Sequence, residues 1–171
     1  MKIVALDLAT STGVAVGTPN SDPIYWSVDL GKGSEDRRFS KVLGMTHQLI
    51  VDHEPDLVAI EAAIGGNMAS PFLIGLVACV RGCCANRGVR CQMYWNGAIR
   101  KHFLGKALTT RDFPGLSKVK AKAAIKNTVV KHCEMLGWSP KTHDEADALA
   151  LLDYALAQNT NHQSRVSGGL L

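Results

Sequence analysis

The sequence predicts an α/β domain built on a mixed sheet, in which an antiparallel three-strand meander is followed by parallel strands and helices flank the sheet. The start of the chain contains three short runs of apolar and β-branched residues separated by turn residues. Beyond them, apolar strand-like runs alternate with amphipathic helical patterns, which is typical of parallel strands joined by helices. The 171 residues are 46% hydrophobic, which suits one domain with an adequate core.

The meander is expected to open with a central strand that carries an acid near its end. Residues 2–8 form this apolar run, and Asp7 is the acid. Residues 9–13 are small or hydroxyl-bearing and predict a tight turn. The second and third strands are expected over residues 13–17 and 24–30.

The rest of the chain predicts helices that alternate with two buried strands. We expect helices over residues 35–53, 71–86, 96–104, 117–136 and 143–157, and strands over 57–60 and 89–94. Ser34, Asn96 and Ser117 are the expected N-cap residues of three helices. The strand over 57–60 is wholly apolar, as buried parallel strands are, and it delivers Glu61 at its tip. Residues 105–116 are expected to form a loop.

The last helix carries the most informative stretch. Thr142 followed three positions later by Glu145 predicts a capping box, so the helix should begin near His143. Asp144 and Asp147 are three residues apart and therefore lie on one face, which His143 shares. One interpretation is that the acids complement the helix dipole.

The other interpretation is a metal site. Two close carboxylates repel each other unless a cation lies between them, and hard divalent ions prefer oxygen ligands. Asp7 and Glu61 each end an apolar strand, where open α/β sheets place their chemistry. The four acids therefore predict one site made of Asp7, Glu61, Asp144 and Asp147.

The charge is unevenly distributed along the chain. Residues 97–141 contain ten Lys or Arg and two acids, whereas the remaining residues contain nine basic and thirteen acidic ones. A basic half beside an acidic cluster suits an enzyme that holds a polyanion near metal-binding carboxylates. A solvated, lysine-rich helix face is the alternative.

Composition also indicates compartment and domain organisation. Five cysteines, an odd number without the spacing of a disulfide framework, indicate a reducing, cytoplasmic location. The longest apolar run, residues 71–80, is too short to span a bilayer. We expect one domain over residues 1–158 and a flexible tail over 159–171.

Taken in order, these features resemble the RNase H-like nuclease fold, and more specifically the RuvC family of Holliday junction resolvases. The resemblance covers most of residues 1–157. It rests on Asp7 in Ala-Leu-Asp-Leu with Gly13 six positions later, Glu61 in Val-Ala-Ile-Glu, and His-Asp-Glu-Ala-Asp-Ala-Leu-Ala at 143–150. The lysine-rich helix that opens as Ser-Lys-Val-Lys-Ala-Lys at Ser117 is similar in character.

The resemblance implies a crossover junction endodeoxyribonuclease, a homodimer that cuts four-way or branched DNA by paired symmetric nicks. We expect two Mg²⁺ ions per active site, replaceable by Mn²⁺ and roughly 3.5–4 Å apart. Asp7 would bridge the ions, Glu61 and Asp144 would each flank one, and Asp147 would complete the site. His143 would orient a ligand or water, or would be a helix-start residue without a role. The residues expected to bind DNA phosphates are Lys118, Lys120, Lys122, Lys126 and Arg111.

The sequence departs from the family pattern at three places. Leu8 and Ala9 stand where the family usually has Pro-Gly, Ile64 stands where many members carry an aromatic residue that stacks on a junction base, and residues 105–116 form a longer segment. We therefore expect cleavage to depend on branch structure more than on local sequence. Arg111 and Phe113 are candidates to replace the missing aromatic contact.

Three other functions remain open at this point. Residues 7–13 also resemble the first phosphate loop of actin-like and sugar-kinase proteins, although those proteins need two such domains. A non-catalytic DNA-binding protein on the same fold is the second alternative. The third is another RNase H-like nuclease, acting on branched DNA or RNA–DNA hybrids, because sequence constrains a metal site better than a substrate.

Overall fold

The computed structural model describes residues 1–63 and 70–167, with side chains described as far as Thr160. Within these residues the sheet has five strands in the order β3-β2-β1-β4-β5. Their bounds are Ile3–Asp7 for β1, Ser11–Gly17 for β2, Ile24–Asp29 for β3, Leu57–Glu61 for β4 and Arg90–Tyr94 for β5. The pairs β1–β2 and β2–β3 are antiparallel, whereas β1–β4 and β4–β5 are parallel. The predicted mixed sheet is confirmed.

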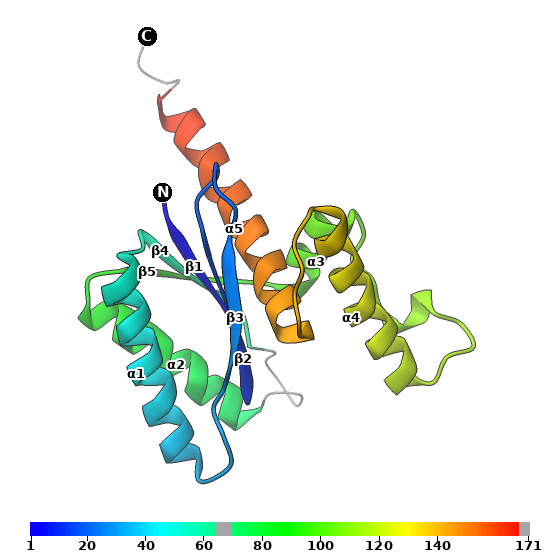
Figure 1. Ribbon diagram of the computed structural model, residues 1–171, viewed down its shortest axis with the longest axis horizontal. Coiled ribbons are helices and arrows are strands. Elements are labelled where there is room, and N and C mark those ends of the chain that lie inside the picture. Colours follow the sequence, from blue (N-terminus) through cyan, green and yellow to red (C-terminus); the bar gives the residue numbers. More distant parts are fainter. Residues whose placement is uncertain (64–69, 168–171) are drawn as a thin grey trace.

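The helices form a layer on each face of the sheet (Figure 1). On one face, α1 (Glu35–His53) and α2 (Pro71–Asn86) pack against each other and cover a core that includes Val4, Leu6 and Val58. On the other face, α5 (His143–Ser167) lies across the strands. Two further helices, α3 (Asn96–Leu104) and α4 (Lys118–Met135), pack against α5 from the side, and α4 leads away from the sheet.

The alternation of side chains along β1 and β4 places two acids on one side of the sheet. Successive side chains of a strand point to opposite faces. In β1, Ile3 and Ala5 belong to the core beneath α5, so Asp7 continues on that side. In β4, Leu57 and Ala59 belong to the same core, and Glu61 follows them. Both carboxylates therefore emerge at the carboxyl ends of their strands, facing α5.

Local sequence explains where most of the helices begin. The hydroxyl of Ser34 accepts a hydrogen bond from the backbone N–H of Arg37, and Ser117 accepts one from Lys120, as predicted for these two caps. The predicted cap at Asn96 is wrong, because the residue before it, Trp95, occupies the N-cap position of α3. The side chain of Asn96 instead contacts an acid of the candidate site.

The largest differences from the sequence-based expectation lie in β2, in the loop 105–116 and in α5. Strand β2 begins at Ser11 rather than 13, and a 3₁₀ turn, η2 (Thr110–Asp112), lies within the expected loop 105–116. Helix α5 runs to Ser167, well beyond 157, so most of the segment expected to be a flexible tail is helical. Polar residues do not stop a helix by themselves, and no Gly or Pro interrupts the sequence before Gly168.

None of the helices in the described part of the chain is long and apolar enough to cross a membrane. Ile64, the position at which an aromatic residue is missing, lies outside the described residues.

Candidate active site

Two strands and one helix bring the predicted acids to the same end of the sheet. The register of β1 and β4 pairs Leu6 with Ile60, so one further step brings Asp7 beside Glu61. Asp144 and Asp147 lie in the first turns of α5, which packs on both strands. The charges of the other three acids all act on Asp7, which is therefore the centre of the group.

The start of α5 is fixed by hydrogen bonds that its own first turn makes. The backbone N–H of Glu145 donates to the hydroxyl of Thr142 over 3.1 Å, which confirms Thr142 as a cap. The Glu145 carboxylate accepts a hydrogen bond from the backbone N–H of Lys141 over 2.6 Å and one from the hydroxyl of Ser27 on β3 over 3.5 Å. Glu145 is only 6% exposed, and each of its carboxylate oxygens accepts a hydrogen bond that fixes the start of α5.

A glycine on β2 allows α5 to approach the sheet. Gly13 pairs with Asp7 across β1 and β2. A Cβ atom at Gly13 would lie 1.9 Å from the backbone oxygen of Asp144 and 3.1 Å from the Cβ of Ala148. Any side chain at position 13 would therefore displace the helix turn that carries Asp144, so Gly13 is part of the scaffold that brings Asp144 to Asp7.

Burial and mutual repulsion make three of the carboxyls hard to ionise. Burial raises the pKa of Asp7 well above its usual range, and the charges of Asp147, Glu61 and Asp144 raise it further. Burial also raises the pKa of Glu61 and of Asp147. Such a concentration of like charge in a partly desolvated place is typical of a functional site rather than of a structural one.

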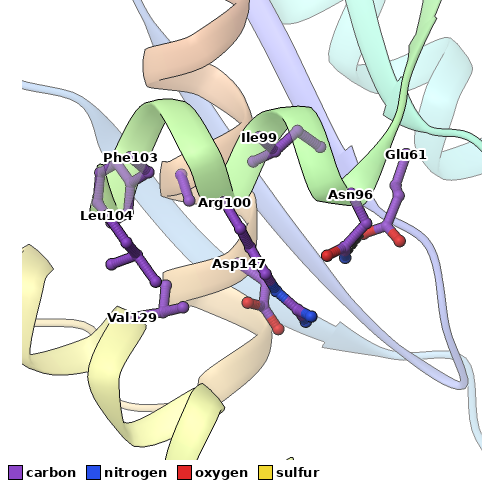
Figure 2. A pocket seen from close by; sticks show the side chains of 9 residues that line it. Glu61, Asn96, Ile99, Arg100, Phe103, Leu104, Val129 and Asp147 are labelled. Carbon is purple, nitrogen blue, oxygen red and sulfur yellow. Dashed lines mark hydrogen bonds between the residues drawn. The ribbon is translucent and has the colours of Figure 1, made fainter. Parts of the chain in front are cut away.

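Basic and amide groups from α3 and α4 partly balance these charges. The ammonium of Lys126 on α4 lies 3.7 Å from the Asp147 carboxylate. The side-chain amide of Asn96 donates a hydrogen bond to Glu61 over 2.8 Å, and Arg100, one turn further along α3, points toward Asp147 (Figure 2). The positive charges of Lys126 and Arg100 both oppose the rise in the pKa of Glu61 and Asp147. The sequence did not identify Asn96 or Arg100 as residues of the site, because no local pattern predicts a contact between α3 and β4.

Two hollows flank the acids. The pocket shown in Figure 2 has a volume of about 10 Å³, about what one water molecule needs, and Glu61, Arg100 and Asp147 are its polar lining residues together with Asn96. A larger hollow of about 170 Å³ lies on the side of α2, lined by Asp7 and Glu61 and by apolar residues that include Leu73 and Val77. Glu61 lines both of them, so its carboxylate lies between the water-sized pocket and the larger hollow.

The acids suit a hard divalent cation by their chemistry. They offer only carboxylate oxygens, the ligands that Mg²⁺ prefers, and their negative charge exceeds what Lys126 and Arg100 supply. As the side chains stand, no three His, Cys, Asp or Glu residues of the described chain converge closely enough to hold an ion. By its chemistry the donor set fits a metal, and its carboxylates would have to come closer together to bind one.

The remaining predicted residues lie around this centre rather than in it. The ring of His143 hydrogen-bonds the side chain of Asn127 on α4 over 2.9 Å, and its charge is one of those that oppose the rise in the pKa of Asp147. Lys118, Lys120 and Lys122 are exposed on α4, and Arg111 is exposed on η2. Lys126 differs from the other predicted DNA contacts because its ammonium faces an acid of the site.

The chain is similar to known proteins in structure. No protein-family model and no curated protein matches the sequence. The structure is similar to RuvC of Thermus thermophilus, with a TM-score of 0.68 and 16% identity, over 94% of this chain and 97% of that one. The chain has a RuvC-like resolvase fold.

Two further solved structures share this fold. Thermus thermophilus RuvC in complex with a Holliday junction substrate matches with a TM-score of 0.64 and 16% identity, over 88% of this chain and 89% of that one. The yeast mitochondrial Holliday junction resolvase Ydc2 matches with a TM-score of 0.55 and 9% identity, over 98% of this chain and 84% of that one. The RuvC-like fold thus extends over nearly the whole chain.

Proposed function

We propose that this protein is a metal-dependent endodeoxyribonuclease that cuts branched DNA and resolves four-way junctions by paired symmetric nicks. The observation that carries the proposal is the cluster of four acids, with Asp7 at its centre, at the carboxyl end of the sheet. The RuvC-like fold supports the same activity, because each of the three similar structures is a resolvase.

The acids are the proposed ligands of two Mg²⁺ ions. Bound metal would supply an activated water on one side of the scissile phosphorus and stabilise the leaving oxygen on the other. The chain itself contributes the placement of the ligands. Asn96 holds Glu61 in one orientation, and the capped first turns of α5 hold Asp144 and Asp147.

The DNA would approach along the basic side of the molecule. Lys118, Lys120 and Lys122 are exposed on α4, and Arg111 is exposed on the neighbouring η2. Contacts of this kind neutralise phosphates and position a duplex without reading its sequence. Lys126, which faces Asp147, is proposed to act at the reaction centre rather than along the flanking duplex.

Two active sites are needed to nick opposite strands of a junction, and a two-fold dimer would supply them. Helix α2 offers a suitable surface. Its outer side leaves Ile74, Ala78, Gly82 and Ala85 exposed at the spacing of one helical face. Small residues on such a face let a second helix approach closely, and Leu43 on the adjacent α1 is exposed as well. We propose α2 as the dimer contact.

A substrate panel tests the proposal. Labelled four-way junction, linear duplex, flap and RNA–DNA hybrid are incubated with the protein, with and without Mg²⁺, beside the Asp7→Asn variant as a control for contaminating nucleases. We expect paired cuts in the junction that require Mg²⁺ and disappear in Asp7→Asn. Preferential cutting of the hybrid would instead identify a different RNase H-like nuclease. Junction binding without any cutting would identify a non-catalytic DNA-binding protein.

A further inference from the structure

Trp95 is exposed to an unusual degree for a tryptophan. Its side chain is 68% exposed, although tryptophans are on average highly buried because they carry a large apolar surface. Trp95 directly follows β5 and occupies the N-cap position of α3 without capping it through its side chain. An indole has no acceptor for the helix N–H groups, so local structure does not explain this residue.

The position of Trp95 places it next to the candidate active site. Strand β5 is the neighbour of β4, and the backbone N–H of Ala62, the residue after Glu61, donates to the carbonyl of Tyr94 over 2.8 Å. Trp95 therefore stands at the carboxyl edge of the sheet, one strand away from Glu61. Its neighbour Asn96 is the residue that hydrogen-bonds Glu61.

The alternation of side chains along β5 defines the face of the sheet on which Trp95 lies. Along β5, Tyr94 belongs to the core beneath α5, whereas Cys91 packs against the core of α1 and α2. Met93 shares the side of Cys91 and is 44% exposed. The backbone of Trp95 is still extended, with φ −79° and ψ 131°, so the alternation continues and Trp95 joins Met93. The apolar wall of the larger hollow, which includes Leu73 and Val77 of α2, lies on this side too.

The charge of the segment that Trp95 opens favours a nucleic acid over a protein core as its partner. The first turn of α3 carries no acid, and its N–H groups give the helix start a partial positive charge. Arg100 and Lys101 follow on the next turn, and the whole segment 97–141 is strongly basic. An exposed aromatic plane at the start of a basic segment suits an unpaired nucleotide, with the base stacked on the ring and the phosphates neutralised by the segment that follows.

We infer that Trp95 is a stacking platform for an unstacked DNA base next to the scissile phosphate. This inference rests on the proposed nuclease function and adds a specificity-determining residue to it. It gives the chain an aromatic contact on an element fixed to the sheet. Neither Arg111 nor Phe113, the residues expected from the sequence for this role, is needed.

The test uses Asp7→Asn as a background, so that DNA is bound without being cut. Binding of a labelled four-way junction is measured by fluorescence anisotropy over a range of salt concentrations, for Asp7→Asn alone and with Trp95→Ala or Trp95→Phe added. Junctions with 2-aminopurine at single positions around the branch report stacking directly, because fluorescence of this base is quenched when it stacks.

Trp95→Ala should weaken junction binding roughly 5- to 150-fold, the range of about 1–3 kcal/mol for one stacked base. The dependence of binding on salt should stay the same, since stacking releases no counterions. One 2-aminopurine position should be quenched by the protein with Trp95, regain fluorescence with Trp95→Ala and remain quenched with Trp95→Phe. Met135→Ala, at the far end of α4 and 80% exposed, is the matched control and should change nothing.

The possible failures are distinguishable. If the protein with Trp95 intact binds no branched DNA, the proposed function is wrong and this inference is wrong with it. If that protein binds and Trp95→Ala binds equally well, only this inference is wrong. If Trp95→Ala converts a dimer to a monomer in size-exclusion chromatography with light scattering and leaves 2-aminopurine quenching intact, Trp95 belongs to a protein interface, which also overturns the inference.

Discussion

At the scale of single residues, the candidate site combines groups that oppose folding with groups that hold them in place. Asp7 is the clearest case, because burial and three neighbouring acids disfavour its charged form. Gly13 and Asn96 have the opposite role, since each positions an acid without carrying a charge. Substitutions of the two kinds should therefore affect stability in opposite directions while both reducing activity.

Replacing Asp7 with Asn should stabilise the protein and abolish cleavage. A group whose folded pKa is raised contributes stability that is fully present below its unfolded pKa and is lost as the pH rises through the folded value. The melting temperature of wild type should therefore fall relative to that of Asp7→Asn as the pH rises above the usual range of an aspartic acid, by about 2–4 °C for each ~1 kcal/mol of stability lost. Mg²⁺ should raise the melting temperature of wild type more than that of the variant. Equal melting curves at every pH would contradict the burial of a charge at Asp7.

Replacing Gly13 with Ala should destabilise the protein and reduce cleavage, because the new Cβ would meet the backbone of Asp144. The cost should be at least that of an overpacked core, about 1–3 kcal/mol. Gly44→Ala on the exposed side of α1 is the control, since a Cβ there meets nothing and should add helix stability. Chemical denaturation measures both, and a Gly13→Ala protein with wild-type stability would show that α5 can move freely away from β2.

Replacing Lys126 with Gln should shift the pH dependence of cleavage. The Lys126 ammonium lowers the pKa of Asp147, Glu61 and Asp7, so its loss should raise all three. The acidic limb of the pH–rate profile should then move to higher pH, whereas Lys122→Gln, exposed one turn earlier on α4, should leave it in place. If both variants only weaken DNA binding and neither moves the profile, Lys126 is a phosphate contact as the sequence first suggested.

At the scale of elements, α4 and α5 have different roles. Helix α5 supplies two acids and much of the core on its face of the sheet. Helix α4 leads away from the sheet (Figure 1), and its lysines at 118, 120 and 122 are exposed. Both helices begin at a hydroxyl-bearing cap that the sequence identifies, because capping is a local interaction. The structure of α3 was less predictable, since Asn96 bonds Glu61, 35 residues away, instead of capping its own helix.

Changing Lys118 and Lys122 on α4 together to Ala should weaken binding of junction and duplex DNA to similar degrees. Phosphate contacts carry little sequence information, and each lost contact should reduce the salt slope by roughly 0.9 log units per log of salt. Salt titrations of DNA binding measure the slope. Lys32→Ala, exposed ahead of α1, is the matched control and should preserve it. A preserved slope in the α4 variant would place these lysines on a surface that DNA does not reach.

At the scale of the whole molecule, the mixed sheet and the elements that carry the four acids were predictable, whereas the contacts between elements were not. Apolar runs that end in an acid predict that β1 and β4 are buried strands with a carboxylate at the tip, but both strands are buried on both faces, so the sequence does not predict which face each acid takes. The approach of Gly13 to Asp144 and the orientation of Arg100 toward Asp147 depend on how helices pack across the sheet. No repeating pattern in the chain encodes those distances.

The proposed dimer can be tested through α2. Ala78→Glu places a charge in the middle of the exposed stripe and should convert the dimer to a monomer with little change in stability, since position 78 is exposed in the single chain. Light scattering measures the mass. The monomer should make single nicks in a junction but lose paired cutting, whereas Asp52→Ala on α1 should do neither. A stable dimer with Ala78→Glu would place the contact elsewhere.

The separation of the acids along the chain has a consequence for synthesis in the cell. The first two carboxylates, on β1 and β4, are made early, but Asp144 and Asp147 emerge from the ribosome only when the sheet is already complete. Helix α5 must then dock over the first two strands, with Gly13 beneath it, before the four groups can meet. A nascent or truncated chain that ends before residue 142 would carry basic residues that attract DNA but only half of the acids. On the proposed function, a chain that lacks a docked α5 should bind DNA without cutting it.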